Sequence, residues 1–215
     1  MRKKSVALVS VVLSGCAAHV YQPEYLAEVS PSYLTEDKIV VLMHDHDQQY
    51  VFEGRPTSRL GETITLTMPI GAILREVTAS VFRSHFMYGV VFTDTLSPDL
   101  LYTLAIEPEV LDFSYRYDRR VEGDVFDLGP DGDGPEPVSI ITPSIEFELA
   151  LAVHDSAGNV LLEKSYPSGI VEGESYIVTS RPHERVNATF HKALQDIMLR
   201  VAEDIRPFLA QAEKG

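Results

Sequence analysis

The hydrophobic positions of this chain recur with two different periods, and each period predicts a different kind of element. Strict alternation is typical of a strand with one buried face, and it runs through residues 145–153, which residues 160–166 are expected to follow as a second strand. The turn sequence DSAGN between them predicts a hairpin. Shorter alternating or continuous apolar patterns predict four further strands, at residues 39–43, 48–54, 63–68 and 88–92.

Two segments repeat their apolar residues at steps of three and four, which is the period of an amphipathic helix. The first begins after Pro69, a residue that favours the first turn of a helix, and should end near Phe86. The second is expected to start around residues 180–184, and Pro207 is expected to bend or end it. Its apolar stripe consists of Val186, Phe190, Leu194, Ile197, Val201 and Ile205.

Between residues 102 and 117 the alternation changes register. The apolar residues are even-numbered up to Ile106 and odd-numbered from Leu111 to Tyr117. One extra residue in a strand produces such a change, and Pro is tolerated at β-bulges. We therefore expect one long strand with a bulge near Pro108.

Residues 121–137 consist mostly of Gly, Pro and acidic residues without an apolar period, which predicts a flexible acidic loop. The predicted order is strands, a helix, several antiparallel strands and a long helix. This order favours an α+β fold, in which an antiparallel sheet has two amphipathic helices packed on one face. Residues 38–212 are expected to form this fold as a single domain, which is long enough to bury a core without disulfides.

The first residues have the layout of an export signal. A basic start, RKK, precedes an apolar run at residues 6–13, which is shorter than the roughly 20 residues of a spanning helix. The sequence LSGC that follows resembles a bacterial lipobox, which implies that residues 1–15 are removed and that Cys16, the only cysteine, is acylated. An ordinary signal peptide stays open as the alternative, with cleavage near Ala17, Ala18 or His19.

Acylation of Cys16 would attach the mature chain to a membrane, because two or three acyl chains anchor a protein almost permanently. Ala17 and Ala18 stand where lipoproteins of the inner membrane often carry Asp, so the resemblance implies the outer membrane, with the domain facing the periplasm. Residues 16–37 are polar and irregular, and they predict a tether. The net charge of −14 argues against nucleic acid as a partner, because phosphate binding depends on clustered Lys and Arg.

The densest group of chemically active side chains is HDHD, at residues 44–47. In an extended segment, His44 and His46 would point to one side and Asp45 and Asp47 to the other. Two imidazoles on one side could share a Zn²⁺ or Cu²⁺ ion. No motif such as HExxH supplies further ligands, so a solvated loop between two strands is the alternative interpretation.

Other motifs give weaker indications. Asp131 and Asp133 lie in a loop that lacks the Gly and Glu positions of an EF-hand, so we expect no dedicated calcium site. The sequence contains no GxSxG motif and no phosphate loop. Four histidines are isolated along the chain: His85, His154, His183 and His191. We therefore expect no catalytic residue, no cofactor and no enzymatic activity.

Residues 101–209 resemble the periplasmic lipoproteins of the YajG and ABC-transport auxiliary (PqiC-like) families. The features that carry this resemblance are the lipobox, a long bulged strand, the hairpin LALAVHDSAGNVLLEKSY and the terminal helix FHKALQDIMLRVAEDI. The resemblance implies a non-catalytic accessory or interaction module of envelope transport or assembly, with another envelope protein as partner. Two alternatives stay open: a metal- or ligand-binding periplasmic lipoprotein that uses His44 and His46, and a structural lipoprotein of a surface appendage.

Overall fold

The computed structural model describes residues 31, 33–63, 65–97, 99–122, 138–177 and 182–212. The elements follow in the order β1 (Ile39–Leu42), α1 (Asp45–Gln48), β2 (Phe52–Gly54), β3 (Leu66–Met68), α2 (Ile70–His85), β4 (Val90–Thr93), β5 (Leu104–Glu122), β6 (Val138–Asp155), β7 (Val160–Pro167), β8 (Val171–Glu172), β9 (Tyr176–Ile177) and α3 (Pro182–Ala212). Cys16, Asp131 and Asp133 lie outside the described residues. Within the described residues, no helix has the length and apolar character needed to cross a membrane.

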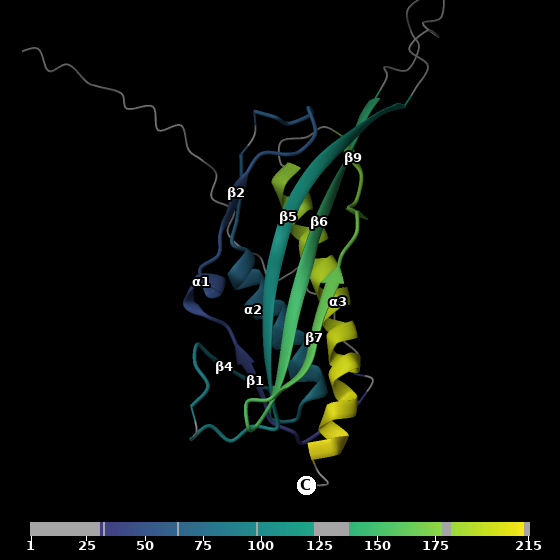
Figure 1. The fold of residues 1–215 in the computed structure, drawn as a ribbon. Coiled ribbons are helices and arrows are strands. Elements are labelled where there is room, and N and C mark those ends of the chain that lie inside the picture. Colours follow the sequence, from purple (N-terminus) through teal and green to yellow (C-terminus); the bar gives the residue numbers. More distant parts are fainter. Residues whose placement is uncertain are drawn as a thin grey trace, which may run out of the picture.

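One large sheet is built around the long ribbon of β5 and β6 (Figure 1). Its order is β4-β1-β5-β6-β7, and β8 and β9 pair with the part of β6 that β7 does not reach. The α+β class is confirmed, and the pairs that β6 makes are antiparallel as expected. The sheet as a whole is mixed, however, because β1 runs parallel to both β4 and β5. The chain passes through α2 before β4 begins, and a crossover of this kind joins parallel strands.

The two long helices pack on one face of the sheet and against each other (Figure 1). Their apolar stripes meet the inward-facing residues of β1, β5 and β6 in one continuous core. The Tyr166 hydroxyl on β7 donates a hydrogen bond to Asp204 Oδ2 on α3 (2.7 Å), which ties the last helix to the sheet. The opposite face of the sheet, here called the open face, is left for polar side chains.

The register change in β5 is real, but it lies further along the strand than predicted. Pro108 pairs regularly with Leu151, and the irregularity falls between Leu111 and Ser114. Asp112 has a φ of 50° there, which places the extra residue in the left-handed region. Pro108 is tolerated without a bulge because β1 pairs with β5 only as far as Ile106, so the proline lies where one neighbouring strand has already ended.

The strands predicted at residues 48–54 and 63–68 are both shorter than expected, since β2 and β3 have three residues each. Of residues 48–54, only β2 is extended, and it pairs antiparallel with β3 in a separate two-stranded sheet. Residues 45–48 form the helical turn α1, because the chain must turn after β1 to reach α2. Helix α3 continues past Pro207 to Ala212, so this proline does not end the helix.

The last residues of the predicted tether are attached to the domain. The Tyr33 hydroxyl donates a hydrogen bond to the carbonyl of Ala202 on α3 (2.7 Å). The Thr35 N–H donates to the carbonyl of His85 (3.0 Å), and the Met87 N–H donates to the carbonyl of Thr35 (2.8 Å). The domain therefore begins a few residues before residue 38.

Candidate functional site

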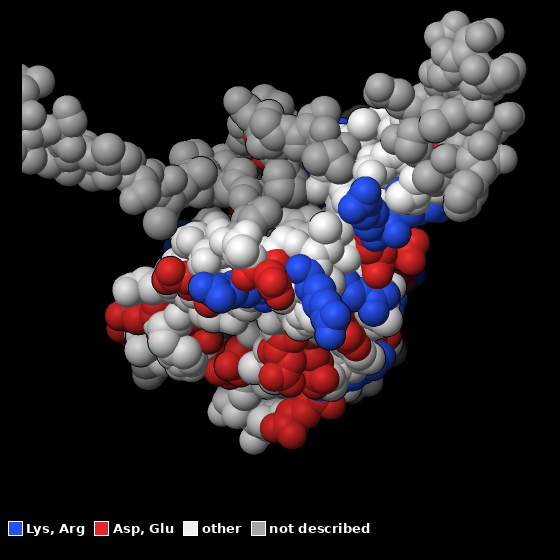
Figure 2. Space-filling view, turned by 90° about the horizontal axis from the view of Figure 1, so that it is seen from above, with Lys and Arg blue, Asp and Glu red and all other residues white. Residues whose placement is uncertain are grey.

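Polar side chains line the open face because alternate residues of its strands point away from the helices. Glu107 and Glu109 occupy such positions on β5, and Glu148 and His154 occupy them on β6. Seen end-on, the molecule gathers acidic side chains along one side, with a few basic ones among them (Figure 2). The carboxylates of Glu107, Glu109 and Glu148 make this part of the open face better suited to a cation than to an anion.

Three of these residues and three from the segment around α1 form what we call the histidine–carboxylate cluster: Glu107, Glu109 and His154 with His44, His46 and Asp47. Glu107 lies between two imidazoles, with Oε1 3.0 Å from His44 Nε2 and Oε2 3.4 Å from His154 Nε2. Strand register explains this placement. Ala105 on β5 pairs with Val40 on β1 and with His154 on β6, so the side chains of these three residues lie on the same face of the sheet. Glu107 is two residues further along β5 and therefore also points to the open face.

His46, Asp47 and Glu109 form the second half of the cluster. One potential ligand atom from each of the three lies within 4.8 Å of the other two. His46 Nε2 lies 3.0 Å from Asp47 Oδ1, and the rings of His44 and His46 stack with 5.8 Å between centroids. The His46 side chain is 73% exposed and that of Asp47 only 12% exposed, so the group opens to solvent on the imidazole side.

The turn α1 is held firmly against helix α2. The carbonyl of His44 accepts the N–H of Asp47 (3.0 Å), and the Gly71 N–H donates to the carbonyl of Tyr50 (3.0 Å). A Cβ atom on Gly71 would lie only 1.9 Å from the carbonyl oxygen of Asp47. Glycine is therefore required at this position for α1 to approach the helix so closely, and the cluster rests on a fixed backbone.

The structure changes the predicted geometry of HDHD. His44 is extended, with a ψ of 156°, but residues 45–48 are helical rather than extended. The two imidazoles nevertheless lie together, as predicted. Asp47 was expected on the opposite side, and this is wrong, because the helical turn brings its carboxylate to His46.

Sequence reasoning missed Glu107, Glu109 and His154 as members of the cluster. Alternation along β5 marks both glutamates as solvent-facing, but only the register between β1, β5 and β6 shows that they face His44 and His154. Of the other isolated histidines, His85 and His191 are buried in the core. The side chain of His183 is not among those described.

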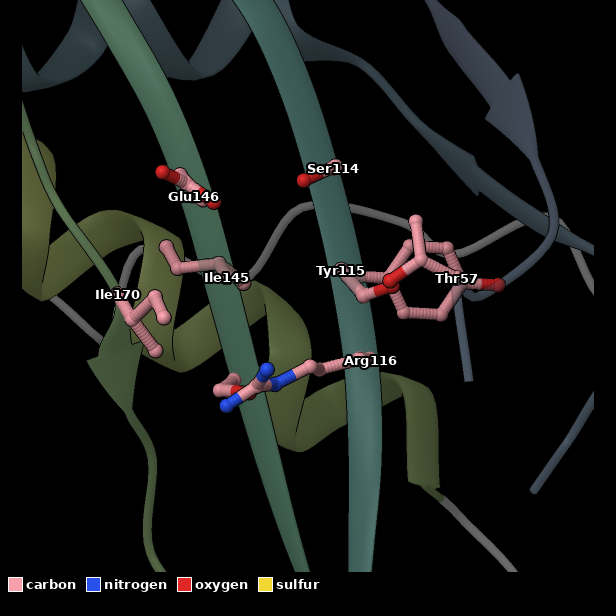
Figure 3. A pocket seen from close by; sticks show the side chains of 8 residues that line it. Thr57, Ser114, Tyr115, Arg116, Ile145, Glu146 and Ile170 are labelled. Carbon is pink, nitrogen blue, oxygen red and sulfur yellow. The ribbon is translucent and has the colours of Figure 1, made fainter. Parts of the chain in front are cut away.

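A small hollow lies further along the open face (Figure 3). Arg116 extends from β5 toward β6, where its Nε donates to Ser144 Oγ (3.0 Å), and Ser114 and Glu146 lie nearby. The volume is about 80 Å³, whereas pockets for organic ligands measure roughly 300–1,000 Å³. None of its lining residues is a histidine, so the hydroxyls have no imidazole base within the hollow.

The outer edge of β4 is a third feature. Within the described part of the chain, β4 pairs with β1 alone, at the edge of the sheet (Figure 1). The Thr93 carbonyl accepts the Met43 N–H (2.9 Å), so the backbone groups of the odd-numbered residues face β1. The N–H and C=O groups of Val90 and Phe92 therefore point to the outer side, because these groups alternate along a strand.

An apolar groove of about 530 Å³, here called the β4 groove, lies beside this edge. Val40 lies at its base, and Tyr88, Val91 and Leu101 border it with largely exposed side chains. Exposed apolar side chains that gather at one place commonly mark an interaction site.

The comparisons with known proteins add a resemblance of fold. No family model matches the chain, and no curated protein matches it in sequence. Solved structures similar to it include protein XCC0632 of family DUF330 from Xanthomonas campestris (12% identity, 86% of this chain and 94% of that chain, TM-score 0.45). Others are a putative neuraminyllactose-binding hemagglutinin homolog from Helicobacter pylori (10% identity, 88% and 98%, TM-score 0.48) and the hypothetical protein CT253 from Chlamydia trachomatis (12% identity, 80% and 98%, TM-score 0.38). At these TM-scores the likeness assigns neither family nor function, so both are argued from the residues.

Proposed function

We propose that this chain is a lipid-anchored protein of the outer membrane that acts without catalysis, by binding an extended segment of another envelope protein along the outer edge of β4. The observation that carries the proposal is the outer β4 edge, which no strand among the described residues pairs with, beside the β4 groove. An accessory role in envelope transport or assembly requires a surface that binds another protein, as this edge can, and it requires no catalytic residues.

The backbone of β4 supplies the chemistry of attachment. Val90 and Phe92 offer N–H and C=O groups that an added strand can pair with, as in strand addition to a sheet edge. Backbone hydrogen bonds require that the incoming segment be extended, but they do not select its side chains. Specificity must therefore come from the side chains beside the edge.

The β4 groove supplies that specificity. Val91 faces the groove from β4, and Tyr88 and Leu101 border it. A segment that pairs with β4 presents every second side chain to this side of the sheet. We therefore expect a partner segment with apolar residues at alternate positions. The proposed envelope location is supported by the resemblance of LSGC, with Cys16, to a lipobox.

Photo-crosslinking in intact cells tests this proposal. A photoreactive amino acid replaces Val91, and the matched control carries it at Val160 on β7, since the two side chains are 52% and 53% exposed. We expect the Val91 probe to give one discrete adduct whose crosslinked peptide has apolar residues at alternate positions. A second chain carries the Val91 probe together with Leu101→Asp, and it should lose the adduct because Leu101 is 78% exposed at the groove.

Three outcomes would contradict the proposal. The same adduct at Val160 would mean unselective contact, and an adduct only with a second copy of this chain would make the edge a self-association surface. No adduct at Val91, in cells where the chain is present and folded, would exclude an occupied β4 edge.

A further inference from the structure

We infer that His46, Asp47 and Glu109 form a binding site for a divalent transition metal ion, for which Zn²⁺ is the suitable probe. This goes beyond the proposed function, because the cluster shares no residue with the β4 groove. The inference rests on which donor atoms the fold brings together, from the turn α1 and from β5.

The donor set matches the chemistry of Zn²⁺. One imidazole and two carboxylates are ordinary ligands of this ion, and the two negative charges offset its charge. Ligand atoms around a tetrahedral ion lie about 3.4 Å apart, so three atoms within 4.8 Å of one another need to move by only about 1 Å. The exposed ring of His46 can make that adjustment by a small rotation.

His44 lies next to the three ligands and can join them as a fourth if its ring turns, since it is outside the group whose ligand atoms lie within 4.8 Å of one another. An ionised Glu107 only accepts hydrogen bonds, so His44 Nε2, 3.0 Å from Glu107 Oε1, carries the proton of the neutral ring. Nδ1 then keeps the lone pair that a metal requires. A carboxylate that orients a ligating histidine in this way is a common feature of metal sites, and the His44 ring already stacks on His46.

The backbone under the site is preorganised. The carboxylate of Asp47 is largely buried, and Gly71 allows α1 to lie directly against α2. Glu109 projects from β5, a strand of 19 residues that is paired along its length with β6. Ligands on such fixed elements lose little conformational freedom when a metal binds, which favours binding at low metal concentration.

Calorimetric titration of the full chain in detergent with ZnCl₂ tests the site. We expect one Zn²⁺ ion per chain, no such binding after His46→Ala, and binding at least about tenfold weaker after Glu109→Gln or Glu107→Gln. Glu163→Gln is the matched control, since Glu163 is an exposed glutamate on β7 that is not part of the cluster, and it should leave the affinity unchanged.

Circular dichroism and urea unfolding establish that each variant is folded, which is expected because His46 and Glu109 are exposed. Failure of the wild-type chain to bind Zn²⁺ would overturn the inference. Unchanged binding in His46→Ala would also overturn it, because the ion would then lie elsewhere on the chain. Val91→Lys, which should disturb only the β4 groove, should leave Zn²⁺ binding intact, so the two proposals can fail independently.

Discussion

His191 is a titratable side chain of α3 that the fold buries completely in the core. Burial disfavours the charged imidazolium and lowers the pKa of His191 to about 4, from the usual 6.5 of a histidine. Between these two values the unfolded chain binds a proton that the folded chain does not. The contribution of His191 to the free energy of unfolding is therefore fully present above pH 6.5, and it declines as the pH falls from 6.5 toward 4.

We expect the free energy of unfolding to fall by about 2 kcal/mol between pH 7.5 and pH 5 because of His191 alone. Urea unfolding at several pH values measures this slope. In His191→Gln the side chain stays neutral, so the stability should be lower at pH 7.5 but nearly constant down to pH 5. An equal slope in both proteins would show that His191 does not titrate in this way.

The bulge of β5 is the feature at the element scale with the greatest effect on the core. Val110, which precedes the bulge, faces the helices. Because of the bulge, Phe113, Tyr115 and Tyr117 face the helices as well. Without the extra residue, the three aromatic side chains would point to the open face. Asp112, with its positive φ, is the residue at which the backbone accommodates this shift of register.

Substitutions at Asp112 test the backbone cost of the bulge, because its side chain is exposed. A β-branched residue is strained at positive φ, so Asp112→Val should lower the free energy of unfolding by about 1–2 kcal/mol. Asp112→Gly should stay within about 0.5 kcal/mol of the wild type, since glycine adopts this conformation readily. Urea unfolding separates the two, and equal midpoints would contradict the explanation.

Local patterns predicted the elements of this fold well. The stripes of α2 and α3 and the β6–β7 hairpin depend on residues close in sequence, and the sequence alone located them. The position of the bulge was missed because Val110 is even-numbered and buried, which extends the first register past Pro108. The parallel placement of β1 was missed because it depends on packing with distant strands.

The candidate site was predictable only in part for the same physical reason. His44 and His46 are neighbours in sequence, so their proximity is a local property. Glu107 reaches His44 across 63 positions of sequence. Such pairs form through strand register, which no local pattern of hydrophobic residues determines.

At the scale of the whole molecule, the anchor proposed at Cys16 decides where the domain resides. Cys16→Ser removes the sulfur that we propose to be acylated, and we expect the chain to move from the membrane fraction to the soluble periplasmic fraction. Fractionation with immunoblotting measures this change. Ala17→Ser serves as a control that leaves the cysteine in place, and a Cys16→Ser chain that stays in the membrane would contradict lipid anchoring.

The short outer edge of β4 limits how strongly copies of the chain can associate with each other. Val90 and Phe92 offer four backbone groups, and hydrogen bonds contribute about 1 kcal/mol each, or about 4 kcal/mol together. This corresponds to a dissociation constant of about 1 mM, before the entropy lost on association weakens it further. Dimers formed through this edge alone would be rare, and a stable complex requires a second protein that also fills the hydrophobic surface beside it.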